Sequence, residues 1–126
     1  MAKSQFRSVR KVSGRKYISF RKKRLSDLGR NPALTQIGKT RLKNKRGMGG
    51  NKKFQLLSDS KVHITDNGKT KAYEIMAVEK NPANVNYSRR NIITKGCIVK
   101  TEKGNVRITS RPGQTGNLFG VLIDKK

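Results

Sequence analysis

Acidic residues are scarce in this sequence. Seven Asp and Glu stand against thirty-one Lys and Arg, which gives a formal net charge of +24 over 126 residues. Because like charges repel, a compact free chain is disfavoured at this charge density, and binding to a polyanion would relieve the repulsion. The few acids fall in predicted turns or on polar strand faces, without an obvious converging pair. We therefore find no general acid and base and expect no enzyme.

Cysteine and histidine are each present only once, as Cys97 and His63. A single cysteine excludes an internal disulfide, and one Cys with one His cannot supply the ligands of a structural zinc site. We expect Cys97 to be a small buried hydrophobe, on a strand face shared with Ile93 and Val99. We expect His63 to be exposed on a strand. No metal or cofactor is predicted.

Long hydrophobic runs are also lacking. The longest, "LFGVLI" at 118–123, has six residues, whereas a helix needs about 20 to span a bilayer. The beginning, "MAKSQFRSVRK", is polar and basic, so we expect an intracellular, cytoplasmic protein with no membrane partner. The tripeptide "GKT" occurs twice, but the glycine that a phosphate-binding loop requires five positions earlier is replaced by Ala33 and His63.

What the sequence has in abundance is positive charge at its N-terminal end. Residues 1–53 carry eighteen Lys and Arg and a single acid, Asp27. The segment 7–30 has too few apolar residues to offset the roughly 1–2 kcal/mol per residue that backbone ordering costs. Apolar spacing over 17–28 predicts a short helix, interrupted by Arg21 and Arg24. We expect residues 1–50 to form a basic, partly helical extension, largely disordered without a partner.

From Phe54 onward the pattern changes to short strands separated by turns. In "KVHIT" at 61–65, polar and apolar residues alternate, which predicts a strand. "DNG" at 66–68 predicts a hairpin turn, and a longer strand is expected over 70–79. Residues 91–110 read as two strands joined through "EKG", "RPGQTG" at 111–116 as a turn, and "LFGVLI" as a buried strand. The fold class predicted is therefore mainly β, with a small closed or nearly closed β-barrel over residues 51–126.

Basic clusters recur along the chain, often beside glycines that let backbone amides approach phosphates. Each Lys or Arg held against a phosphate releases condensed counterions, so nucleic acid is the predicted partner. The predicted RNA-binding residues are Arg7, Arg10, Lys11, Arg15, Lys16, Arg21, Lys22, Lys23, Arg24, Arg30, Lys43, Lys45, Arg46, Lys52, Lys53, Arg89, Arg90, Asn91 and Arg111.

Two of these clusters are predicted to meet. If the strands within 91–109 pair as one hairpin, Arg89 and Arg90 at its beginning lie beside Arg111 just after its end. Three guanidiniums would then converge at one end of the barrel, where each can hold phosphate through two parallel hydrogen bonds.

Structured RNA suits this layout better than sequence-specific DNA reading. No zinc-finger, basic-zipper or helix-turn-helix pattern is present, and the seven aromatic residues are expected mostly at apolar strand positions rather than on a stacking platform. A barrel with a penetrating basic arm fits recognition through shape and backbone. A free nucleic-acid chaperone or a chromatin-like architectural protein remains an alternative, whereas an RNA-modifying enzyme lacks a catalytic set.

One stretch is specific enough to suggest a family. "NPANVNYSRRNIITKGCIVKT", followed by "VRITSRPGQTG", closely resembles the archaeal and eukaryotic small-subunit ribosomal protein of the S8e type. "SGRKY" at 13–17, "RKKRLSDLGR" at 21–30, "QIG" at 36–38 and "GGNKKFQLL" at 50–57 occur in the family's order. The resemblance thus covers nearly the whole chain.

The resemblance implies a β-barrel body with a basic extension embedded in small-subunit ribosomal RNA, beside neighbouring ribosomal proteins. It implies a structural role without catalysis, a cofactor or a small-molecule substrate. Eukaryotic members carry a large insertion that this chain lacks, so the resemblance is to the compact archaeal form.

Overall fold

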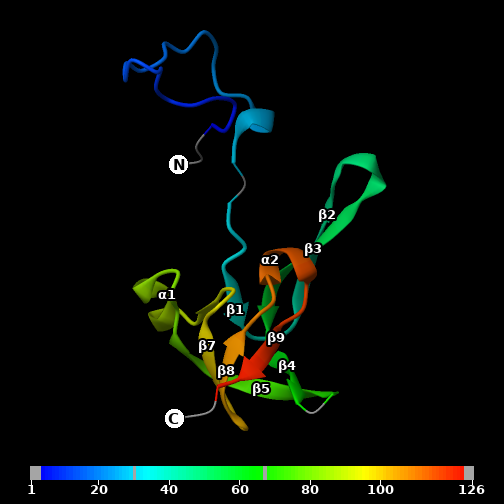
Figure 1. Ribbon diagram of the computed structural model, residues 1–126. Helices are drawn as coiled ribbons and strands as arrows, with labels where there is room; N and C mark the ends of the chain where they lie inside the picture. Colours follow the sequence, from blue (N-terminus) through cyan, green and yellow to red (C-terminus); the bar gives the residue numbers. More distant parts are fainter. Residues whose placement is uncertain (1–3, 30, 67, 124–126) are drawn as a thin grey trace. The chain divides into compact units, whose positions relative to one another are not determined.

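The computed structural model describes residues 4–29, 31–66 and 68–123. The chain divides into two compact units, Met1–Pro32 and Ala33–Lys126, which are described separately (Figure 1). The first unit contains one short 3-10 helix, η1 (Leu25–Asp27). The second contains β1 (Thr35–Ile37), β2 (Arg41–Arg46), η2 (Met48–Gly50), β3 (Lys52–Asp59), β4 (Lys61–Asp66), β5 (Lys69–Lys80), α1 (Val85–Arg89), β6 (Ile92–Ile93), β7 (Ile98–Thr101), β8 (Gly104–Ile108), α2 (Pro112–Thr115) and β9 (Phe119–Leu122).

Five strands close into a barrel in the order β4-β5-β7-β8-β9. Neighbouring strands are antiparallel, except that β9 closes the barrel by pairing in parallel with β4. The turn from β4 to β5 follows the predicted "DNG", with Asp66 opposite Lys69 and Gly68 at φ +76°. Closure leaves none of the five strands with an unpaired edge. The predicted mainly β fold with a small closed barrel is therefore confirmed.

The barrel interior is filled by alternating aliphatic side chains. Val62 and Ile64 of β4 and Val106 and Ile108 of β8 are at most 1% exposed, because successive residues of a strand point to opposite faces. The core also receives Leu56 and Ile93 from outside the barrel. Cys97 is fully buried in this cluster, as predicted, but it lies in the turn before β7 and not on a strand. Burial raises the pKa of its thiol. A buried, protonated thiol is a poor nucleophile.

The remaining strands form a second sheet in the order β2-β3-β1-β6. β2 and β3 are antiparallel, β1 pairs in parallel with β3, and β6 pairs antiparallel with β1. The buried Thr35 hydroxyl of β1 donates to the Leu56 carbonyl oxygen at 2.8 Å. Leu56 of β3 and Ile93 of β6 are buried in the core cluster, whereas no residue of β2 is buried. The hydrophobic face of this sheet thus joins the barrel core.

Several local predictions need correction. The hairpin predicted through "EKG" is present as β7 and β8, with Thr101 opposite Gly104, but it does not include Ile92 and Ile93, because a turn at 94–97 separates β6 from β7. Residues 112–115 form the short helix α2, which ends at Gly116 in the left-handed conformation. The strand β9 exists, but Phe119 and Val121 on its outer face are 41% and 54% exposed. Because a barrel strand buries only one of its faces, the prediction that β9 is buried on both faces is wrong.

The first unit is a folded-back loop. Backbone hydrogen bonds join Tyr17 N to Val9 O at 3.1 Å and Gln5 N to Asp27 O at 2.7 Å. The helix expected over residues 17–28 is not observed, since only η1 is helical there. The four consecutive basic residues 21–24 would crowd like charges within one helical turn, and the neighbouring hydrophobic side chains have no core to cover.

The boundary between the two compact units falls between Pro32 and Ala33 in the chain, whereas the sequence pattern predicts a functional division near residue 50, which stays a prediction. The difference arises because β1 and β2 are tied to β3 by strand pairing. Strand pairing gives backbone order to a segment that is almost entirely polar, as β2 is. Apolar alternation does not reveal such a segment.

Hydrogen exchange on the free protein distinguishes the two boundaries. We expect slow amide exchange in β1 and in the part of β2 next to Ser58, because their amides are paired within the sheet, and faster exchange over residues 4–29, where single backbone hydrogen bonds replace continuous strand pairing. The measurement is amide exchange by mass spectrometry without RNA. Fast exchange up to residue 50, with protection beginning only at β3, would instead support the division expected from the sequence.

Close packing at Gly120 gives a second prediction. A Cβ atom at this position would overlap Val106 Cγ1 and lie 3.1 Å from the Arg107 carbonyl oxygen. We expect Gly120→Ala to lower the free energy of unfolding by about 2 kcal/mol, since overpacking shifts the backbone of two paired strands. Gly113→Ala is the matched control, because its Cβ would meet only Ala33 Cβ at an ordinary 3.4 Å. Equal denaturation midpoints for both variants would show that the β8–β9 contact is not tight.

Candidate nucleic-acid interface

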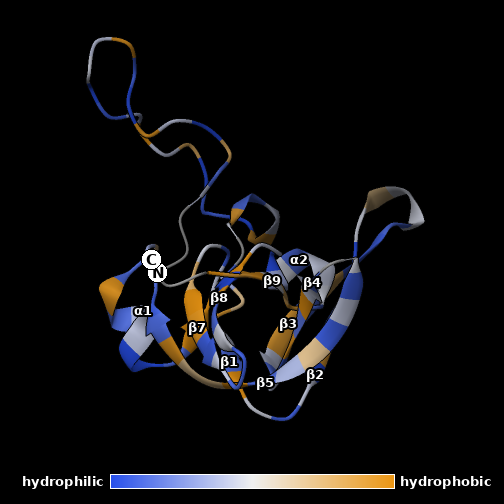
Figure 2. Ribbon diagram, turned by 60° about the horizontal axis from the view of Figure 1, so that its bottom comes forward, coloured by the Kyte–Doolittle hydropathy of each residue, from blue (hydrophilic) through white to orange (hydrophobic). Residues whose placement is uncertain are grey.

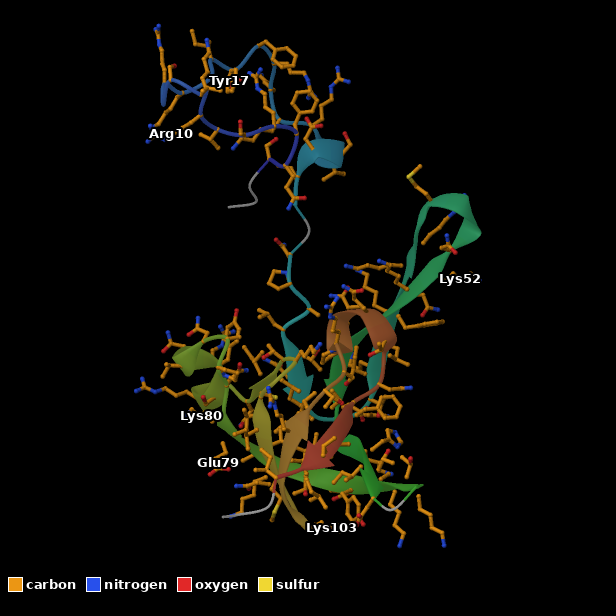
Figure 3. The ribbon with its side chains drawn as sticks, in the orientation of Figure 1. Arg10, Tyr17, Lys52, Glu79, Lys80 and Lys103 are labelled. Carbon is orange, nitrogen blue, oxygen red and sulfur yellow. The ribbon has the colours of Figure 1, made fainter. Side chains whose placement is uncertain are left out.

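The β2–β3 hairpin carries a dense group of predicted RNA-binding residues. Figure 1 shows its outer part, closed by η2, standing clear of the barrel, and Figure 3 places Lys52 on it. Its register places Lys45 opposite Lys53 and Arg46 opposite Lys52. Four of the predicted residues thus form two directly facing pairs of like charge. Lys43 lies on the same strand, opposite Gln55.

These like-charged pairs have no acidic neighbour to offset them. The ion pairs observed within the described residues are Arg21 with Asp27 and Lys103 with Asp66, neither on this hairpin. Like charges directly opposite each other destabilise a strand pair. Positive charge is therefore concentrated at the hairpin tip, and an anion bound beside these side chains would stabilise it.

The helix α2 lies beside this hairpin. It packs against β3, and Thr115 forms a parallel bridge with Phe54. Gly116, at the end of α2, has no room for a side chain, because a Cβ atom would lie 2.8 Å from Phe54 Cβ. The exposed Arg111 occupies the N-cap position of α2 without a capping hydrogen bond from its side chain, and so belongs to the part of the fold that carries β3.

Arg89, Arg90 and Asn91 gather at the other short helix. Arg89 ends α1, Arg90 is its C-cap, and both are exposed. Asn91 also stabilises the local structure. Its φ is +51°, and its side-chain oxygen accepts a hydrogen bond from Val78 N at 3.2 Å. Its remaining polar group is the amide nitrogen.

The sequence predicted that these arginines lie beside Arg111, on the assumption that the strand after Asn91 pairs with the strand before Arg111. That strand pairing is not observed. β6, which follows Asn91, pairs with β1 rather than with β8. Figures 1 and 2 show α1 and α2 on different sides of the second unit. The two arginine clusters thus lie on separate parts of this unit.

In the first unit the predicted residues are spread around the loop. Arg7, Arg10, Lys11, Arg15, Lys16, Lys22, Lys23 and Arg24 are exposed, and Arg21 is half-buried. Two of them are fixed by backbone oxygens: Arg7 Nη2 donates to Ile18 O at 3.0 Å, and Arg10 Nη1 to Gly14 O at 2.8 Å. Arg30 lies outside the described residues.

The single acid of the N-terminal segment is already paired. Arg21 Nη1 lies 2.6 Å from Asp27 Oδ2, and this hydrogen bond lowers the pKa of Asp27 below its usual value of 3.8. The Arg24 backbone N–H also donates to the same carboxylate at 3.4 Å. Asp27 therefore fixes Arg21 and offers little charge to the other basic residues of the loop.

On the barrel, Lys103 is paired in the same manner. Its Nζ lies 2.5 Å from Asp66 Oδ2 and 5.7 Å from the Tyr73 ring centre, so it joins the turns at the ends of β4 and β7. The hydrogen bond lowers the pKa of Asp66 and raises that of Lys103. Figure 3 shows Lys103 at this end of the barrel.

His63 is not the freely exposed residue that strand alternation suggested. It is half-buried on β4, with its ring 5.4 Å from that of Phe119 across the parallel pair that closes the barrel. Within the described residues, no three His, Cys, Asp or Glu side chains gather as metal ligands. No helix among these residues has the length and apolar character to cross a membrane.

The sequence argument missed one feature of the first unit. Phe6, Tyr17 and Phe20 do not lie on strands but surround the guanidiniums of Arg7 and Arg21. A signal was present in the sequence, because Phe6 precedes Arg7 and Phe20 precedes Arg21 directly. Aromatic residues interleaved with arginines are typical of nucleic-acid surfaces.

The two ion pairs predict reciprocal titrations. Arg21→Gln is expected to return the pKa of Asp27 toward its usual value and leave that of Asp66 low, whereas Lys103→Gln should do the opposite. Since the folded-state pKa values are lowered, the stabilisation by each pair is present above the ordinary carboxyl pKa and is lost as pH falls through the lowered one. Carboxyl-carbon NMR titration measures both. An Asp27 pKa that Arg21→Gln leaves unchanged would contradict the ion pair between Arg21 and Asp27.

Comparison with known proteins identifies a family. A sequence model of the family described as "Ribosomal protein S8e" matches residues 4–123. The protein named small ribosomal subunit protein eS8 from Methanobrevibacter smithii is 49% identical over 125 residues, which cover 98% of this chain and 100% of the relative. Proteins of the same name from Halorubrum lacusprofundi and Nanoarchaeum equitans are 45% and 47% identical, covering 97% and 94% of this chain and 99% and 95% of their own.

These matches extend over nearly the whole of both partners and include the basic loop, the β2–β3 hairpin and the barrel. The resemblance inferred from "NPANVNYSRRNIITKGCIVKT" is thereby confirmed, and the relatives are archaeal, as the compact form implied. The chain therefore belongs to the ribosomal protein S8e family, whose members are structural ribosomal proteins and not enzymes.

Proposed function

We propose that this protein is a structural constituent of the small ribosomal subunit and stabilises small-subunit ribosomal RNA through phosphate contacts. The contacts come from the basic residues of 1–50, from the β2–β3 hairpin and from the connections that carry Arg89, Arg90 and Arg111. Its other partners are neighbouring proteins of the small subunit, and it acts in the cytoplasm as part of the ribosome. The curated relatives carry the name of a small-subunit protein, which supports this proposal.

The observation that carries the proposal is the facing of like charges on the β2–β3 hairpin. Lys45 lies opposite Lys53, and Arg46 opposite Lys52, at the end that stands clear of the barrel. A solubilising surface does not require such pairs, since charges of both signs serve that purpose at no cost in strand pairing. Phosphates lying along the hairpin would convert this repulsion into attraction.

The local backbone also favours anion contacts. Gly49 and Gly50 at the hairpin tip have positive φ values of +65° and +74°. Without side chains, these residues allow an RNA backbone to come close to the peptide amides. Gly47 N donates to Asn51 O at 2.6 Å, which closes the tip into a defined turn.

The remaining basic residues extend the interface. In the first unit, Lys22 and Lys23 lie beside Arg21, whose charge is engaged by Asp27. In the second unit, Arg89 and Arg90 lie on the side of α1, and Arg111 lies on the side of β3. Separate clusters on separate elements suit a protein that bridges several RNA segments better than one that fills a single groove.

The hairpin gives the sharpest test. The double variant Lys45→Gln/Lys53→Gln should weaken binding to archaeal small-subunit ribosomal RNA, and the slope of log K against log salt should decrease by about 0.7–0.9 for each phosphate that is no longer bound. The same variant should leave the stability of the free protein unchanged or raise it by up to about 1 kcal/mol, because a repulsive pair is removed. Salt-dependent filter binding and thermal unfolding measure the two effects.

Lys95→Gln/Lys100→Gln is the matched control, with the same loss of charge at exposed positions outside the predicted interface. It should reduce the slope much less than the hairpin variant. Equal reductions for both variants would mean that net charge alone determines binding. An unchanged affinity of the hairpin variant would remove the β2–β3 hairpin from the interface.

A further inference from the structure

The first unit contains a cavity of about 440 Å³, a size in the range of small-ligand sites. Its wall includes Phe6, Tyr17 and Phe20 together with Arg7, Lys22 and Lys23. Every one of these side chains comes from the folded-back loop, and none belongs to the barrel. The cavity is thus a property of the segment 4–27 by itself.

Aromatic rings and guanidiniums are stacked along this wall. Arg7 Cζ lies 4.4 Å from the ring centre of Tyr17 and 5.3 Å from that of Phe20. Arg21 Cζ lies 4.9 Å from the ring centre of Phe6 and 5.4 Å from that of Phe20. The rings of Phe6 and Phe20 are 6.1 Å apart with a tilt of 54°. Figure 3 shows Tyr17 among the basic side chains of this loop.

Both guanidiniums are held in place by other groups. Arg7 donates to Ile18 O at 3.0 Å, and Arg21 donates to Asp27 at 2.6 Å. Because these hydrogen bonds fix the arginines, the rings that they contact are positioned as well. An ordered stack loses less conformational freedom when it binds a ligand than a mobile set of side chains would.

The rings nevertheless remain largely open to solvent. Phe20 is 66% exposed, Phe6 56% and Tyr17 40%. Exposed aromatic surface is unfavourable in water, and here it faces a cavity whose other lining groups include Lys22 and Lys23. The fitting ligand is accordingly flat and apolar on its faces, and it carries negative charge at one end. A nucleotide has this combination.

We propose that this cavity binds one unpaired nucleotide of an RNA strand, with its base stacked on the exposed ring of Phe20 and its phosphate held by Lys22 or Lys23. This inference rests on the proposed RNA-binding function and adds recognition of a base to phosphate contact. A base inside a double helix already stacks on its neighbours, so the nucleotide comes from a loop, a bulge or a strand end. Base-on-aromatic stacking tolerates any of the four bases, so the site selects an unpaired base rather than a sequence.

The experiment compares two RNA probes on the full-length chain. One is a single-stranded hexanucleotide with a central 2-aminopurine, a fluorescent base that is quenched when it stacks. The other has the same phosphates but lacks that one base. We expect the base-bearing probe to bind about five- to a hundredfold more tightly, the range of stacking on one aromatic side chain, and to be quenched on binding.

Phe20→Leu should remove most of this difference and of the quenching, while affinity for the abasic probe stays the same. Phe20→Trp should preserve the difference, because a larger ring stacks at least as well. Phe119→Leu is the matched control, since Phe119 is a 41% exposed phenylalanine on the barrel strand β9. It should change neither binding nor quenching.

Other outcomes would overturn the inference. Equal affinity of the wild-type chain for both probes, with a steep salt dependence, would leave phosphate binding intact and show that no base is recognised. Loss of the difference in both Phe20→Leu and Phe20→Trp would mean that the ring is needed for the loop's own structure. Binding to anionic phosphatidylserine vesicles that depends on Phe20, without a preference between the probes, would assign the cavity to lipid. Absence of salt-dependent binding to either probe would instead contradict the proposed function itself.

Discussion

Repulsion between positive charges is the constraint on which the rest of this structure depends. With thirty-one basic and seven acidic residues, the chain cannot neutralise itself, and the ion pairs observed in its described part engage only Asp27 and Asp66. The repulsion is tolerated because most basic side chains lie on a surface loop, a hairpin and element ends, where water screens them. The buried apolar residues lie in the closed barrel, its adjoining sheet and the connections beside them. The fold thus separates the buried apolar core from the segments with the highest density of positive charge.

The barrel was predictable because its physical determinants are local in sequence. Val62 and Ile64 alternate with polar residues, and the sequence "DNG" that follows them strongly favours a hairpin turn. β2 could not be recognised in this manner, since none of its residues is buried and its order comes from pairing with β3. The strand partner of Ile92 and Ile93 could not be predicted from the sequence either. Both are buried, but their partner is β1, more than fifty residues earlier in the chain.

The sequence predicts which residues belong to the candidate interface, but not how these residues are arranged in space. The excess of Lys and Arg indicated a polyanion and pointed to the clusters that the structure places on the surface. Which clusters meet is a property of strand order: Arg111 accompanies β3 through α2, while Arg90 follows α1 elsewhere. The stacking of Arg7 and Arg21 on aromatic rings was not foreseen, because it depends on a loop that folds back on itself. Propensities for helices and strands say nothing about such a loop.

The parallel pairing of β4 with β9 also bears on how the molecule is made. His63 and Ile64 find their partners only at Phe119 and Gly120, so the barrel stays open until β9 has been synthesised and has left the exit channel of the translating ribosome. The basic loop and the β2–β3 hairpin emerge long before that moment, since they precede β4 in the chain. During this interval the charged segments are already available to a polyanion while the apolar strands lack their final neighbour. Early capture by RNA would keep the nascent chain soluble and hold it in place until the last strand completes the core.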